Sequence, residues 1–167
     1  MKILFVSFLV WLAPAAVALY GQQDGSYNGH GYFWFSVDKP NGAGWEAHTA
    51  GGGGEGFLYK GLAAGADMGY WFPRGAFAAG IGLLSVNGAY HLVNREERGR
   101  FVPFVTAGYT LGFRARTRNY FNWGGGATYW FSRRVGMRVE VRDLRPRDRY
   151  SHTTVRFGVQ ISIEELL

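Results

Sequence analysis

A hydroxyl, an imidazole and a carboxylate lie close together near the C-terminus, where Ser151, His152 and Thr154 follow Asp148. A hydroxyl beside a base is the arrangement that nucleophilic catalysis needs, and it would suit acyl transfer. The same pairing is common in ordinary loops, and no surrounding motif fixes the geometry of these four residues. We therefore predict that the chain has no catalytic residues and is not an enzyme.

The remaining residues that could hold a metal or a cofactor do not form a motif. His30, His48 and His91 are scattered and lack a metal-ligand spacing such as H-E-x-x-H. The chain has no cysteine, which excludes disulfides and thiolate metal sites. The run Gly51–Gly54 is followed neither by Gly-Lys-Ser/Thr nor by a helix pattern, so it is not a phosphate-binding loop. We predict no metal and no cofactor.

A third group of polar residues consists of charged side chains that alternate with apolar ones. Alternation places them on one face of extended strands, and opposite charges at matched depth favour an enclosed ion-pair network. Soluble proteins normally expose many lysines, whereas lysine occurs here only at Lys2, Lys39 and Lys60. We predict an inward-facing network in which Arg138, Glu140 and Arg142 pair with Glu55 or Asp67. The complete set is Glu55, Asp67, Arg114, Arg138, Glu140, Arg142 and Arg156. A pore lining is the alternative.

The composition indicates that strands position these side chains. Glycine contributes 26 of 167 residues and aromatic residues 17%, which argues against disorder and against a helical bundle. Apolar and polar residues alternate with a period of two in several segments separated by turn signals. We predict eight strands, at 27–37, 46–58, 62–72, 77–92, 101–115, 120–131, 135–144 and 152–163.

The apolar face of these strands and the N-terminus point to a membrane. Residues 1–18 read as a secretory signal peptide that ends at Ala16-Val17-Ala18. Beyond residue 20 no apolar run is long enough for a membrane helix, but strands can still cross. Aromatic residues gather at predicted strand ends as an interfacial girdle would, at Phe57, Tyr59, Tyr70–Phe72, Tyr120–Trp123 and Tyr129–Phe131.

The expected fold is all-β, an eight-stranded antiparallel up-and-down transmembrane β-barrel formed by a domain at 19–167. Both termini are expected to be periplasmic. The expected outer loops are 38–46, 72–76, 115–120 and 144–152, and the expected periplasmic turns are 59–61, 93–100 and 132–134.

Three stretches resemble the small bacterial outer-membrane β-barrel proteins, the OmpA/OmpX-like family with its porin-family relatives. They are Pro103–Tyr109, Trp123–Phe131 and Val135–Asp143. The last strand also resembles the insertion signal of such barrels, with the pattern Arg156-x-Gly158-x-x-Ile161-x-Ile163. The resemblance implies residence in the bacterial outer membrane, insertion by the barrel-assembly machinery, and contact with outer-membrane lipid and lipopolysaccharide. A monomer is expected.

Basic residues also cluster in two predicted loops of the same rim, at Arg116, Arg118, Arg145, Arg147 and Arg149. Guanidinium groups suit bidentate contacts to phosphates, so these residues are candidates for binding lipopolysaccharide or another anion. Neutralisation of the cluster by Asp143 and Asp148 is the alternative. The formal net charge of +6 does not indicate a nucleic-acid partner, because the arginines lie on alternating strand positions and in turns.

The sequence thus predicts an outer-membrane barrel with a structural or surface-interaction role, a lumen filled by side chains, and no catalysis. A narrow porin-like channel for small solutes, a lipid-modifying outer-membrane enzyme and a soluble lipocalin-like binding barrel are the alternatives.

Overall fold

The computed structural model describes residues 29–40, 46–92, 100–114, 117–146 and 152–163. They form eight strands and one short 3-10 helix, η1 (Phe77–Ala79). No helix among them is long and apolar enough to cross a membrane. The strands are β1 (Gly29–Pro40), β2 (Ala47–Tyr59), β3 (Leu62–Pro73), β4 (Ile81–His91), β5 (Phe101–Phe113), β6 (Thr117–Trp130), β7 (Val135–Pro146) and β8 (His152–Ile163).

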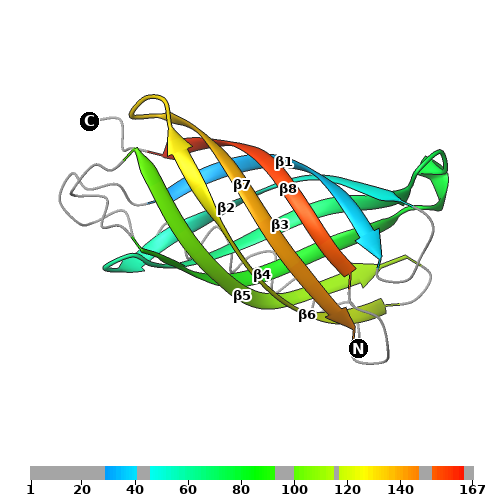
Figure 1. Cartoon of the computed structure of the whole chain (residues 1–167). Helices are drawn as coiled ribbons and strands as arrows, with labels where there is room; N and C mark the ends of the chain where they lie inside the picture. The colour runs from blue at the N-terminus through cyan, green and yellow to red at the C-terminus, as the bar shows by residue number, and fades with distance from the viewer. Residues whose placement is uncertain (1–28, 41–45, 93–99, 115–116, 147–151, 164–167) are drawn as a thin grey trace.

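The eight strands close into one barrel in chain order (Figure 1). Each strand pairs antiparallel with the next, and β8 pairs with β1 from Gly29↔Ile163 to Pro40↔His152. Closure gives every strand two hydrogen-bonded neighbours, so the wall of the barrel has no open edge. The predicted fold class, an eight-stranded antiparallel up-and-down barrel, is therefore confirmed.

The loop between β3 and β4 corrects one predicted boundary. The fourth strand begins at Ile81 instead of residue 77, because residues 77–79 form η1. Arg114 donates to the carbonyl oxygens of Ala78 and Ala79, and the Tyr70 hydroxyl donates to that of Phe77. These side-chain contacts satisfy carbonyl groups of residues 77–79 that strand pairing would otherwise satisfy. β6 also begins earlier than expected, at Thr117.

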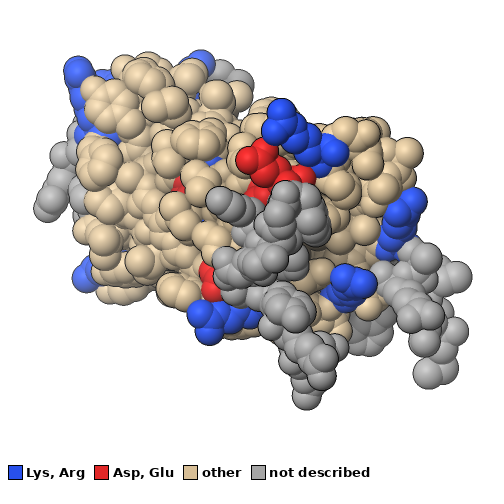
Figure 2. All heavy atoms as spheres, turned by 45° about the vertical axis from the view of Figure 1, so that its right-hand side comes forward, with Lys and Arg blue, Asp and Glu red and all other residues tan. Residues whose placement is uncertain are grey.

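The two faces of the barrel wall have opposite polarity. Outward-facing apolar side chains such as Phe33, Val105 and Val159 are half or more exposed, and Phe33 reaches 71%. Inward-facing Ser85, Thr110 and Gln160 on the neighbouring positions have no exposed surface. Figure 2 shows one face on which most charged atoms gather toward the two ends of the barrel. The barrel is polar inside and apolar outside, the reverse of an ordinary soluble protein.

The predicted aromatic girdle is only partly present on the outside. Tyr59, Phe121 and Phe131 are more than half exposed. Tyr120 is buried, and the Phe57 ring packs inside the barrel at 4.9 Å from the ring of His91. The period of two explains the difference, because consecutive aromatic residues on a strand point to opposite faces. Part of the predicted aromatic girdle therefore lies inside the barrel.

The glycine run of β2 belongs to the sheet, as expected. Gly51 faces inward, and a Cβ atom there would lie 2.7 Å from the indole ring of Trp34. A Cβ atom on Gly69 would lie 2.8 Å from the same ring. The glycines therefore leave the space that a large side chain from β1 occupies inside the barrel.

Candidate functional site

The candidate site is the interior of the barrel, where six of the seven charged residues predicted to form the lumen network come together. All six are buried, and they come from β2, β3, β7 and β8. Three are carboxylates and three are guanidinium groups, so the charges within this set balance. They are Glu55, Asp67, Arg138, Glu140, Arg142 and Arg156.

One end of the network is centred on Glu55 of β2. Its Oε1 atom accepts a hydrogen bond from Nη1 of Arg138 at 3.0 Å. The Nε2 atoms of His30 and His91 lie 2.6 Å and 2.9 Å from the same oxygen. Both histidines are buried, and the sequence pattern did not predict either of them in the network. Strand alternation could have predicted the position of His30. His30 pairs with Glu55 across β1 and β2, so both side chains point into the barrel.

The centre of the network joins β7 to β3 and β8. Glu140 accepts from Nε of Arg138 at 3.3 Å through one oxygen and from Nε of Arg142 through the other. Arg142 in turn donates to Asp67 at 3.0 Å. Asp67 also accepts from the amide of Asn87 at 2.9 Å. The structure thus has the predicted ion pairs between β7 and the two carboxylates, with Arg138 on Glu55 and Arg142 on Asp67.

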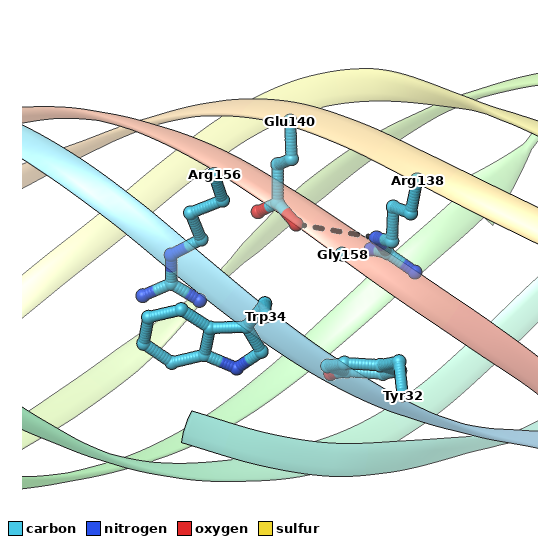
Figure 3. A pocket seen from close by; sticks show the side chains of 6 residues that line it. All are labelled: Tyr32, Trp34, Arg138, Glu140, Arg156 and Gly158. Atoms are coloured by element: carbon cyan, nitrogen blue, oxygen red, sulfur yellow. Dashed lines mark hydrogen bonds and ion pairs between the residues drawn. The ribbon is translucent and has the colours of Figure 1, made fainter. Parts of the chain in front are cut away.

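Arginine–aromatic contacts fill the space around the ion pairs. The Arg156 guanidinium lies 4.0 Å from the Trp34 ring centroid (Figure 3). Its Nη1 atom is 3.5 Å from Asp67. The Arg138 guanidinium lies 3.8 Å from the Phe104 ring centroid. A cation over an aromatic face is attracted by the ring quadrupole, and the attraction increases when water is excluded. These contacts help to hold the two guanidinium groups in the interior.

One cavity among these side chains is very small. It measures about 10 Å³ and is lined by residues of β1, β7 and β8, among them Arg138, Glu140 and Arg156 (Figure 3). A volume of about 10–15 Å³ holds a single water molecule. Elsewhere in the interior, uncharged polar side chains fill the space and form hydrogen bonds with one another. Ser85 bonds to Thr110, Asn122 to Thr110, and Thr128 to Gln160.

Arg114 does not belong to the network, which corrects the prediction. It is exposed and follows the last residue of β5, Phe113, so strand alternation no longer sets its direction. Its guanidinium donates to the carbonyl oxygens of Ala78 and Ala79, at 3.0 Å and 2.9 Å. Arg114 therefore fixes the β3–β4 loop at the rim of the barrel.

Two of the five predicted rim arginines can be placed. Arg118 and Arg145 are exposed, on β6 and β7, at the barrel end that also carries η1. Arg145 donates to Asp143 at 2.8 Å, and its guanidinium lies 5.6 Å from the Trp123 ring centroid. Arg116, Arg147 and Arg149 lie outside the described residues, as does the predicted signal peptide 1–18.

Comparisons with solved structures identify the architecture. The N-terminal β-barrel domain of Pseudomonas aeruginosa OprF matches with a TM-score of 0.64 and 16% identity, over 81% of this chain and 98% of that domain. Neisserial surface protein A (NspA) matches with a TM-score of 0.59 and 10% identity, over 81% of this chain and 96% of NspA. The chain has the fold of the small outer-membrane β-barrels. A de novo designed transmembrane β-barrel also matches, with a TM-score of 0.53 and 17% identity, over 85% of this chain and 98% of the design.

No family model and no curated protein matches the chain. The comparisons therefore establish the barrel architecture, and residue roles come from the geometry of this chain.

The last strand of this outer-membrane barrel fold carries the predicted insertion pattern. Arg156 and Gly158 face the interior, and Ile161 faces outward. Ile163 pairs with Gly29 and so lies on the ladder that closes the barrel. The insertion pattern therefore shares Arg156 with the ion-pair network.

The structure places only part of the hydroxyl–imidazole group. The Thr154 hydroxyl is buried and donates to the carbonyl oxygen of Arg142 at 3.2 Å. His152 is the first residue of β8, and Asp148 and Ser151 lie outside the described residues.

The network generates a stability prediction. Asp67→Asn removes one charge that faces two buried guanidinium groups, so it should lower the free energy of unfolding by about 3–5 kcal/mol. The matched control is Asp143→Asn, which breaks an ion pair whose Arg145 is 62% exposed and should cost below about 1 kcal/mol. Urea unfolding in detergent micelles, followed by tryptophan fluorescence, measures both. Equal and small decreases in the free energy of unfolding for the two variants would show that the interior charges do not depend on one another.

Proposed function

We propose that this protein is a bacterial outer-membrane β-barrel with a structural or surface-interaction role and no catalytic activity. The observation that carries the proposal is the inverted polarity of the barrel, whose apolar face is outside and whose ion pairs are inside. A closed barrel with an apolar outer band is the form in which strands cross a bilayer. The fold shared with OprF and NspA supports the same location.

The same observation argues against a soluble lipocalin-like barrel. A soluble binding barrel needs a polar outer surface and an apolar cavity inside. Here Phe33, Met68 and Phe101 each expose more than half of their surface. Contiguous apolar surface of this kind is rare on soluble monomers and marks an interaction surface.

A permanent channel is disfavoured by the filling of the interior. Eight strands enclose a space that side chains can fill completely. Glu55, Asp67 and Glu140 connect β2, β3 and β7 through arginines that cross this space. We infer that the interior charges hold the barrel together and do not conduct solutes.

The exposed rim carries the proposed surface interaction. Arg118 and Arg145 are exposed at the end of the barrel that carries η1, and Arg147 and Arg149 are close to Arg145 in sequence. Guanidinium groups at the surface suit lipopolysaccharide phosphates. We propose that a monomeric barrel, inserted by the barrel-assembly machinery, uses this rim to contact outer-membrane lipopolysaccharide.

The filled interior predicts an electrical result. Purified protein reconstituted into planar lipid bilayers should show little or no steady conductance, because ion pairs block the path of ions. Glu55→Gln should raise the frequency of brief openings, since Arg138 loses one of its two charged partners. Stable, large currents from the unaltered protein would instead favour the porin-like channel.

If the outer face lies in lipid, the free-energy cost of a charge on it depends on depth in the bilayer. Val159→Arg places a charge on the outward face midway along β8, where burial in lipid should cost about 2–4 kcal/mol. Thr153→Arg, on the same face but near the strand end, should cost at most about 1 kcal/mol. Refolding from urea into phospholipid vesicles measures both free energies. Equal tolerance of Val159→Arg and Thr153→Arg would show that this face is not in lipid.

The rim predicts binding to anionic lipid. Replacement of Arg145, Arg147 and Arg149 with Gln should weaken binding to lipopolysaccharide vesicles and flatten its dependence on salt, because screened phosphate contacts are lost. Replacement of Arg100, Arg133 and Arg134, at the opposite end, removes the same charge and serves as the control. Identical affinities and salt slopes for the two triple variants would leave the rim cluster without a recognition role.

A further inference from the structure

The outer wall of the barrel contains a groove over β1 and β2. Its volume is about 330 Å³, and its lining includes Gly31, Phe33, Gly52 and Ile161. Gly31 and Gly52 alternate with inward-facing residues and so point outward, where they contribute no side chain. The volume lies at the low end of the range for sites that bind small molecules, about 300–1,000 Å³.

The lining of the groove is apolar. Phe33 and Ile161 form its walls and are 71% and 47% exposed. The floor is glycine backbone whose polar groups are used in the ladders, because Gly31 pairs with Gly54 on one side and with Ile161 on the other. A ligand that fills the groove therefore needs no hydrogen-bonding groups, and a hydrocarbon chain meets this requirement.

A cationic residue lies directly after the end of β2, one of the strands that form the floor of the groove. Lys60 follows β2 in the turn to β3, is exposed, and has its ammonium 5.2 Å from the Tyr59 ring centroid. Lys60 is eight residues beyond Gly52 of the groove lining, or about 26 Å along a strand, and a tilt of about 40° reduces this to about 20 Å of depth. That depth is about half of a bilayer of about 40–45 Å that includes the headgroup regions. A lipid phosphate beside Lys60 would thus place its acyl chain along the groove.

We propose that the groove over β1 and β2 is a binding site for one acyl chain of an anionic phospholipid, whose phosphate contacts Lys60. The site continues the lipid-facing surface of the barrel, so it rests on the proposed membrane location. A second copy of the chain fits less well. A stable protein interface buries about 1,200–2,000 Å² in total, and the projecting Phe33 side chain keeps a flat partner away from the glycine floor.

Two outward-facing glycines provide matched variants. A Cβ atom on Gly31 would come no closer than 3.7 Å to its nearest neighbour, and one on Gly88 no closer than 3.9 Å. Both positions therefore accept a side chain without a backbone clash. Gly31→Leu fills the groove, whereas Gly88→Leu adds the same side chain on β4, outside the groove lining.

Native mass spectrometry of the barrel in detergent, with dioleoylphosphatidylglycerol as the probe, tests the site. The unaltered protein should retain one lipid, Gly31→Leu should bind it about tenfold more weakly because the apolar contact area is occupied, and Gly88→Leu should bind it normally. Lys60→Gln should also weaken retention. Equal retention by the two leucine variants would overturn the proposal, and so would a dimer mass that only Gly31→Leu abolishes.

The membrane location itself is checked separately on the same samples. If the unaltered protein stays folded in buffer without detergent and carries no lipid, the proposed function fails. If it requires detergent and yet the leucine variants do not differ, only the acyl-chain site fails.

Discussion

The structure depends on the pairing of charges that water cannot reach. Arg142 is 1% exposed, and it contacts both Glu140 and Asp67. A buried guanidinium without a counter-charge costs several kcal/mol. Since β7 and β8 supply three arginines and only one carboxylate to the network, they need the carboxylates of β2 and β3 across the interior. Closure of the barrel meets this condition, because it places β2 and β3 across the interior from β7 and β8. The ion pairs and the closed sheet therefore require each other.

The outer face follows from the same constraint. Since the polar side chains are used inside, the alternate positions are free to be apolar, and they are apolar along most strands. The interior is crowded enough to need glycine opposite Trp34, whose indole supports Arg156. Outside, the same glycine-rich strand leaves a groove beside Phe33. The glycines of β2 thus account both for the space that Trp34 fills inside and for the groove outside.

Much of this arrangement could be predicted from alternation alone. The period of two identified the eight strands and placed Glu55, Asp67 and the charges of β7 on the inner face. It did not reveal η1 or the position of Arg114, because both depend on contacts between residues about 35 positions apart. His30 and His91 were missed because scattered histidines carry no motif, although their inward positions place them beside Glu55. The aromatic clusters were overassigned to the outer face, since alternation sends every second ring inside.

The central claim is that this chain forms a membrane barrel with a closed, ion-paired interior. The most direct test is expression of the full chain in a Gram-negative bacterium, followed by separation of the soluble periplasm, inner membrane and outer membrane. The account predicts recovery in the outer membrane, with an unheated sample that migrates faster on a denaturing gel than a boiled one, because the compact barrel resists detergent. Recovery of folded protein in the soluble periplasm would contradict it.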